Sequence, residues 1–183
     1  MKRIYLAGPD VFKPDALALG RQKKALCAEF GFEGVFPLDN EIEDFRHDSE
    51  TAFRIARANE KLMDSCHLGL ANMEPWHGPS MDVGTAYEMG YLRAQGKPTF
   101  AYSTTLEKFA PRVASHFMSP LTPDHSGGLR DPHGHIVETF GDLQDNLMMM
   151  HALHLSGSGL HPTFNAALQA ARDILQEPPS SAP

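Results

Sequence analysis

The feature that most constrains the fold is an alternation of short apolar segments with amphipathic ones. Four apolar segments that end at Gly, Pro or polar loop residues are typical of buried strands: residues 3–8, 34–40, 66–73 and 97–102. Helical patterns lie between them, at residues 15–30, at 49–64 behind a possible Ser49 or Thr51 cap, and from Thr85 onward. Strand and helix patterns therefore alternate four times within about 100 residues.

This alternation predicts an α/β fold, in which helices cover both faces of a parallel sheet. We expect a single-domain three-layer sandwich with a mostly parallel, flavodoxin- or Rossmann-like sheet. In such sheets, ligands bind beyond the carboxyl ends of the strands. The loops that follow residues 8, 40 and 73, and the turn that holds Asp82, are predicted to meet at this edge.

The second half of the chain has weaker patterns. Residues 119–135 are rich in Pro, Gly and His and predict a long surface loop, whose role as a lid or a subunit contact stays open. Helical patterns follow at 140–155 and 161–176. We expect one domain over residues 1–177 and a disordered tail at 178–183.

Composition excludes several classes of protein. The net charge of −7 argues against general binding to nucleic acid or to a membrane surface. The two cysteines, Cys27 and Cys66, do not make a disulfide framework and are expected to be reduced. The N-terminal apolar run is too short for a signal peptide, and no run approaches a membrane span. These features predict a cytoplasmic protein.

Acidic side chains gather at or near the predicted edge of the sheet: Asp10, Asp39, Glu41, Asp64, Asp82 and Glu88. Glu88 stands out because Glu88 and Arg93 are the only charged residues between positions 83 and 96. Thr85 and Glu88 fit a capping box, which would give Glu88 a structural role. A poorly solvated carboxylate is also what a nucleophile requires, and Asp82 nearby could donate a proton. The two interpretations are compatible.

Other chemistry is less well supported. The His-Gly-His segment at 133–135 and the pair His151 and His154 lack the cysteine or carboxylate partners of zinc sites. The chain has no phosphate-binding loop, no dinucleotide fingerprint and no nucleophile elbow. We therefore expect no metal ion and no organic cofactor.

Five sequence blocks, in order, resemble the nucleoside 2-deoxyribosyltransferase family. They are IYLAGPDVF, FPLDNE, MDSCHLGLANM, MDVGTAYEMGYLRAQGKP and DNLMM, and the resemblance covers roughly residues 3–150. The block that contains Asp82 and Glu88 is the most specific. The resemblance implies a deoxynucleoside and a free nucleobase as substrates.

The resemblance also implies roles for three side chains. Glu88 matches the glutamate that attacks C1′ of a 2′-deoxynucleoside, which would give a covalent glycosyl-enzyme and net retention. Tyr5 matches a tyrosine that orients this glutamate by a hydrogen bond. Asp82 matches an acidic residue that would shuttle a proton to and from the base.

Further positions match residues that bind the substrate. Asp64 corresponds to an acidic residue near the catalytic carboxylate, and Gly8 would let the backbone approach the sugar closely. Glu41 falls where some relatives have a glutamine that contacts the base. This departure leaves the choice between purines and pyrimidines open.

Asn146 and Met148 match residues that a neighbouring subunit supplies to hold the sugar 5′-hydroxyl. The resemblance thus implies a homo-oligomer, at least a dimer, in which these residues complete the neighbour's site. Packing in the core is the alternative role for the methionines.

Two other functions remain open. A hydrolase of deoxynucleosides or nucleoside 5′-monophosphates would use the same nucleophile, but Asp10 and Asp15 would repel a 5′-phosphate. A nucleotide-binding module without catalysis would not need Tyr5, Asp82 and Glu88 together. The full set of matched residues favours the transferase.

Overall fold

The four predicted strands and a fifth that was not predicted form a fully parallel sheet. The structure, a computed structural model, describes residues 1–40 and 42–176. The strand order is β2-β1-β3-β4-β8, made of β1 (Lys2–Ala7), β2 (Phe32–Val35), β3 (Leu68–Asn72), β4 (Thr99–Tyr102) and β8 (Leu160–His161). The chain crosses from β2 past β1 to β3, so the strand order reverses beside β1. This order is flavodoxin-like and confirms the predicted α/β class.

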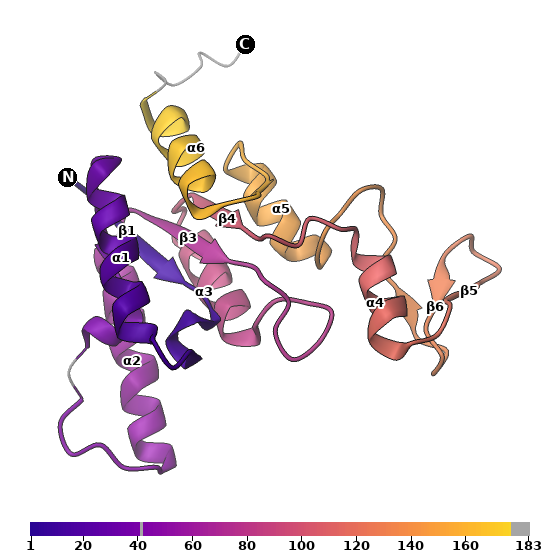
Figure 1. The fold of residues 1–183 in the computed structure, drawn as a ribbon, viewed down its shortest axis with the longest axis horizontal. Helices are drawn as coiled ribbons and strands as arrows, with labels where there is room; N and C mark the ends of the chain where they lie inside the picture. The colour runs from indigo at the N-terminus through magenta and orange to yellow at the C-terminus, as the bar shows by residue number, and fades with distance from the viewer. Residues whose placement is uncertain (41, 177–183) are drawn as a thin grey trace.

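Helices cover both faces of the sheet, which gives the three predicted layers (Figure 1). On one face α1 (Ala16–Glu29) and α6 (Phe164–Gln176) pack over a core that includes Ile4 and Leu6. On the other face α2 (Ser49–Ser65), α3 (Val83–Ala94) and α5 (Leu147–Leu155) pack over Tyr5 and Ala7. Alternate residues of β1 thus face opposite layers, as the two-residue period of a strand requires.

Two local features of the helices concern the cap of α2 and a glycine within α1. The cap of α2 is Asp48, whose carboxylate accepts a hydrogen bond from the backbone N–H of Thr51 at 2.8 Å, so neither Ser49 nor Thr51 is the cap. Gly20 lies within α1, where a Cβ would come within 2.6 Å of the Phe36 ring. The glycine therefore serves close packing of α1 rather than a break in the helix.

The segment after β4 contains structure that the sequence patterns did not predict. We call residues 109–137 the arm: α4 (Phe109–Phe117) and a small antiparallel sheet of β5 (Thr122–Pro123), β6 (Leu129–Arg130) and β7 (Ile136–Val137). Figure 1 shows α4, β5 and β6 at one end of the long axis, away from the parallel sheet.

The predicted loop at 119–135 is therefore a set of two hairpins. Asp124 accepts hydrogen bonds from the backbone N–H groups of Ser126 and Gly128, and Asp131 accepts them from His133 and His135. Aspartate side chains that bond to their own turns replace the regular pattern that a longer strand would show.

The later elements are shorter than predicted or were missed. α5 begins only at Leu147, so the helix expected over 140–155 lacks its first turns. β8 was not predicted, because two residues carry no period. The helix at 161–176 is confirmed as α6, with a start at Phe164. Residues 178–183 lie outside the described residues, and the domain limits of 1–177 stay a prediction.

Candidate active site

The loops that follow β1 and β3 meet at the carboxyl edge of the sheet, beside the reversal of strand order. Gly8 ends β1 with a φ of +149°, and a Cβ at this position would lie 2.6 Å from the Asn72 Cβ. Only glycine fits both the backbone conformation and the contact with β3. The structure thus explains Gly8 by this contact, while its approach to a sugar stays a prediction.

Glu88 lies in the first half of α3, and the predicted capping box of Thr85 and Glu88 is wrong. The helix is capped by Asp82, whose Oδ2 accepts hydrogen bonds from the backbone N–H of Thr85 at 2.8 Å and from its hydroxyl at 2.9 Å. Thr85 is therefore the partner of a cap and not the cap. The Glu88 side chain is available for another role.

That side chain turns toward the sheet. The phenol of Tyr5, which is fully buried on β1, donates a 2.5 Å hydrogen bond to Glu88 Oε1. Burial raises the pKa of the Glu88 carboxyl to about 7, the bond from Tyr5 opposes this rise, and the charge of Asp82 adds to it. Burial also raises the pKa of Tyr5, so the phenol stays protonated and keeps its donor role. The result is an oriented carboxylate that ionises near neutral pH.

Asp82 connects this carboxylate to an open pocket. The pocket has a volume of about 700 Å³ and is lined by Phe12, Trp76, His77, Asp82 and Val83. The rings of Phe12 and Trp76 are stacked, with centroids 5.9 Å apart and planes 23° from parallel. Aromatic faces beside a carboxylate suit a planar heterocycle that needs a proton. Sequence analysis missed these aromatic residues, although Trp76 and His77 stand in the loop that follows β3.

A second polar cluster fixes the loop after β1. Asp10 is buried and accepts hydrogen bonds from Lys13 Nζ at 2.7 Å, from Lys23 Nζ and from Asn72 Nδ2 at 3.0 Å. Burial alone would raise the pKa of Asp10, but Lys23 and these hydrogen bonds outweigh burial and lower the pKa to about 2. Lys23 also donates to the Tyr102 hydroxyl at 2.6 Å. The cluster ties the loop that carries Phe12 to α1, β3 and β4.

Asp64 does not join the site. It lies in the last turn of α2, which leads into the amino end of β3, so it is at the opposite edge of the sheet from Gly8. Its carboxylate accepts hydrogen bonds from the Tyr91 hydroxyl at 2.9 Å and from Gln95 at 2.7 Å, near the end of α3. The prediction that Asp64, at the end of α2, lies at the carboxyl edge of the sheet is therefore wrong. Glu41 lies outside the described residues.

Asn146 has a structural role within its own chain. It caps α5 by accepting a hydrogen bond from the Met148 backbone N–H at 3.0 Å, and its amide donates to Glu138 Oε1 at 2.6 Å. Met148 is 61% exposed and is therefore no core residue of the single chain. The structure brings Tyr5, Asp82 and Glu88 together, whereas the hydrogen bonds described for Asn146 and Met148 do not reach these three residues.

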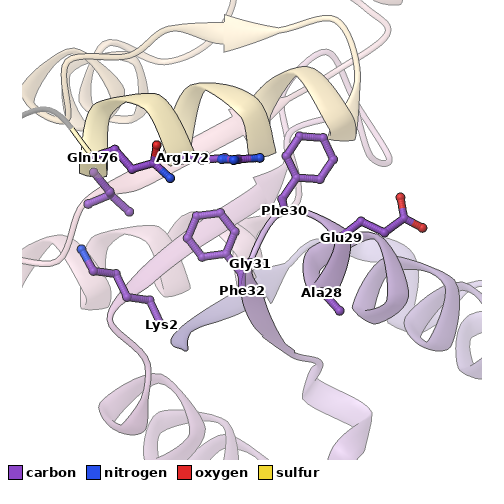
Figure 2. Close-up of a pocket in the computed structure, with 9 residues that line it drawn as sticks. Lys2, Ala28, Glu29, Phe30, Gly31, Phe32, Arg172 and Gln176 are labelled. Carbon is purple, nitrogen blue, oxygen red and sulfur yellow. The ribbon is translucent and has the colours of Figure 1, made fainter.

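A further pocket, of about 380 Å³, lies at the other edge of the sheet (Figure 2). It is lined by the start of β1, the turn before β2 and the end of α6, with Phe30 and Phe32 among its residues. Its position at the amino ends of the strands makes it a poor candidate for the active site.

Residues 1–40 and 42–176 contain neither a candidate metal site nor a helix able to span a membrane. This part of the chain contains no cluster of three or more His, Cys, Asp or Glu side chains that could hold a metal ion. Nor does any described helix combine the length and apolarity needed to span a bilayer.

Comparison with known proteins identifies the family of this chain. Residues 4–148 match the family model of nucleoside 2-deoxyribosyltransferase. The chain belongs to this family. The resemblance noted in the sequence is thereby confirmed, and an enzyme of the deoxyribosyltransferase family is supported.

Individual relatives in this deoxyribosyltransferase comparison resemble the chain over most of its length. An uncharacterised protein of Schizosaccharomyces pombe is 36% identical over 173 residues, which cover 88% of this chain and 82% of that protein. The structure of a 2-desoxiribosyltransferase from Leishmania mexicana matches with a TM-score of 0.72 and 27% identity, over 94% of this chain and 98% of that one. A conserved protein from Enterococcus faecalis, 19% identical with a TM-score of 0.57 over 96% and 98% of the two chains, shares the fold.

We predict that Tyr5→Phe raises the pKa of Glu88 above about 7, because the variant loses the hydrogen bond that favours the charged carboxylate. Carboxyl-detected NMR during a pH titration of the free protein measures this pKa. Tyr102→Phe is the matched control, since the Tyr102 hydroxyl bonds to Lys23 and not to Glu88. An unchanged Glu88 pKa in Tyr5→Phe would contradict the proposed contact.

Proposed function

We propose that the protein transfers the 2-deoxyribosyl group between nucleobases through a covalent intermediate on Glu88, with net retention at C1′. The observation that carries this proposal is the Tyr5–Glu88 pair: a poorly solvated carboxylate, held by one phenol, in a member of this enzyme family. A carboxylate in this state loses little solvation when it attacks carbon.

In the first step, a Glu88 oxygen forms a bond to C1′ while the bond from C1′ to the base nitrogen breaks. The electron pair leaves with the base, and Asp82, which lines the open pocket, would relay a proton from solvent to the departing base. The negative charge of Glu88 stabilises the positive character that develops at C1′. Tyr5 keeps one Glu88 oxygen hydrogen-bonded, so the other oxygen is the attacking one.

In the second step, a nitrogen of the incoming base attacks C1′, the ester to Glu88 breaks, and Asp82 takes up the proton. Two inversions at C1′ give retention. Phe12 and Trp76 would stack on the departing and incoming bases in turn. Water can replace the incoming base, so slow hydrolysis accompanies transfer. The donor set of the site supplies this chemistry without a metal ion or an organic cofactor.

Hydrolysis of nucleoside 5′-monophosphates is the second candidate function. The pairing of Asp10 with two lysines favours it, whereas the sequence alone argued against it. Asp10 was expected to repel a phosphate, but its carboxylate is neutralised by both Lys13 and Lys23. These three side chains together leave one positive charge in excess. A 5′-phosphate therefore meets no unpaired negative charge from Asp10.

We predict that the wild-type protein, given a 2′-deoxynucleoside and a different free base, produces a new deoxynucleoside. The rate should rise with pH through about 7, because the nucleophile must be ionised. Glu88→Gln, which keeps the bond from Tyr5, should lose roughly a thousandfold or more of this activity. Chromatography of the products measures both effects.

The same assay separates the candidates. Free base released at one rate, whether or not an acceptor base is present, indicates a hydrolase, and a requirement for the 5′-phosphate indicates a nucleotidase-type substrate. Tight nucleotide binding without turnover would contradict both enzyme functions and favour a binding module.

We also propose that two copies associate through α3 and α5, which pack against each other. Large apolar or aromatic side chains are exposed on both helices: Val83 and Tyr87 are 85% and 57% exposed on α3, and Met148 and Leu155 are 61% and 50% exposed on α5. Exposed side chains of this kind are typical of a subunit interface. Met148 would then lie against the neighbouring subunit's site.

We predict that Leu155→Glu reduces the mass of the assembly in light scattering, whereas Leu17→Glu, at an equally apolar exposed position on α1, does not. If Met148 completes the neighbour's site, Glu88→Gln and Met148→Glu should each be inactive. After refolding together, the two variants should recover about a quarter of the wild-type activity. A wild-type monomer with full activity would contradict the shared site.

A further inference from the structure

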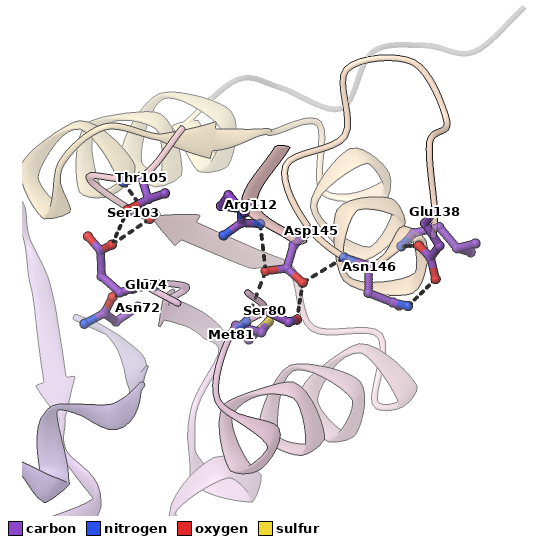
Figure 3. A network of polar contacts seen from close by, with 11 residues as sticks. Asn72, Glu74, Ser80, Met81, Ser103, Thr105, Arg112, Glu138, Asp145 and Asn146 are labelled. Atoms are coloured by element: carbon purple, nitrogen blue, oxygen red, sulfur yellow. Dashed lines mark hydrogen bonds and ion pairs between the residues drawn. The ribbon is translucent and has the colours of Figure 1, made fainter. Parts of the chain in front are cut away.

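Asp145 is a buried side chain whose carboxylate accepts hydrogen bonds from four donors (Figure 3). It is 1% exposed and lies between the arm and α5. Its Oδ1 accepts hydrogen bonds from the Ser80 hydroxyl and from the Asn146 backbone N–H at 2.8 Å. Its Oδ2 accepts them from the Met81 backbone N–H at 3.1 Å and from Arg112 at 3.4 Å. One carboxylate thus connects three segments that are distant in the sequence.

Two of these bonds reach the residues immediately before Asp82. Ser80 and Met81 belong to the loop between β3 and α3, and this loop has no regular secondary structure of its own. Met81 is buried, and the bond to Asp145 satisfies its backbone N–H. The direction in which the chain enters α3, and with it the place of Asp82, therefore depends on Asp145.

We infer that Asp145 is a positioning residue that holds Asp82 beside Glu88. The inference deepens the proposed function, on which the catalytic meaning of Asp82 rests. Asp145 touches neither the pocket nor Glu88 in the described contacts, so it acts through the Ser80–Met81 segment.

Arg112 plays a separate part in the network. Its guanidinium makes one long contact to Asp145, and among the described residues its Nε is buried with no hydrogen-bond partner. The carboxylate keeps three other donors without Arg112. The arginine therefore ties α4 to the network, whereas Ser80 and Met81 transmit the position of Asp145 to α3.

The pKa of Glu88 reports the position of Asp82 directly. Among the described residues, Tyr5 and Asp82 are the two groups that act on Glu88 besides burial. The acidic side chains of α2 that face α3, Glu60 and Asp64, bond to Tyr87 and Tyr91 instead. The histidines of α5, His151 and His154, are exposed. A change in this pKa, with Tyr5 and the burial of Glu88 unaltered, thus means that Asp82 has moved or lost its charge.

The test measures the Glu88 pKa by carboxyl-detected NMR on the free protein, so that it needs no turnover. Asp82→Asn sets the scale, because asparagine keeps the helix cap and removes the charge, and it should lower the Glu88 pKa. Asp145→Asn places an amide where two donors converge and breaks part of the network. It should lower the Glu88 pKa by at least half of the decrease that Asp82→Asn causes.

Controls separate positioning from general destabilisation. Asp131→Asn alters an aspartate that bonds only within its own turn of the arm, and it should leave the Glu88 pKa unchanged. Should Asp145→Asn fail to fold, Ser80→Ala removes one of the two bonds to the loop and should lower the pKa by a smaller amount. Ser80→Thr, which keeps a hydroxyl, should restore it.

Each outcome decides the inference. An unchanged Glu88 pKa in both Asp145→Asn and Ser80→Ala, with Asp82→Asn lowering it, would show that Asp145 is structural only. An unchanged pKa in Asp82→Asn would overturn the inference as well, because Asp82 would then not lie close enough to act. Failure of wild-type transfer, by contrast, would overturn the proposed function and leave the pKa result standing.

Discussion

The chemistry proposed for this protein depends on one hydrogen bond, from the Tyr5 phenol to the Glu88 carboxylate. Burial disfavours the charged form of Glu88, and a lone buried carboxylate would remain protonated and inert as a nucleophile. One neutral donor returns part of the lost solvation without forming an ion pair that would quench the charge. A pKa of about 7 is the balance of these effects, and it leaves the carboxylate both ionised and reactive near neutral pH.

The surrounding structure gives each of the other carboxylates near Glu88 its own partners. Asp10 is paired with two lysines, which help to lower its pKa, and Asp145 accepts hydrogen bonds from four donors. Asp82 is held as a helix cap, which fixes its distance from Glu88 along α3. These four acidic side chains all carry a carboxylate, but each has a different set of partners. Different partners give the carboxylates different roles.

The sequence predicted the sheet and its layers well, because the alternation of strand and helix patterns extends over many residues. Glu88 was predicted as a candidate because it and Arg93 are the only charged residues between positions 83 and 96. Asp64 was misplaced because its position depends on the edge at which α2 ends, and Asp145 was missed because three of its four donors come from distant segments. The two-residue strand β8 has no period to detect. Local patterns predict elements, whereas contacts between distant segments determine the site.

The most direct test of the central claim is to look for the glycosyl-enzyme itself. The protein is mixed with a 2′-deoxynucleoside without an acceptor base, quenched rapidly in acid, and examined by intact mass and peptide mapping. The proposed mechanism predicts a mass increase of one deoxyribosyl group, located on the peptide that contains Glu88 and absent in Glu88→Gln. Release of base without any adduct on this peptide, or an adduct on another residue, would contradict the assignment of Glu88 as the nucleophile.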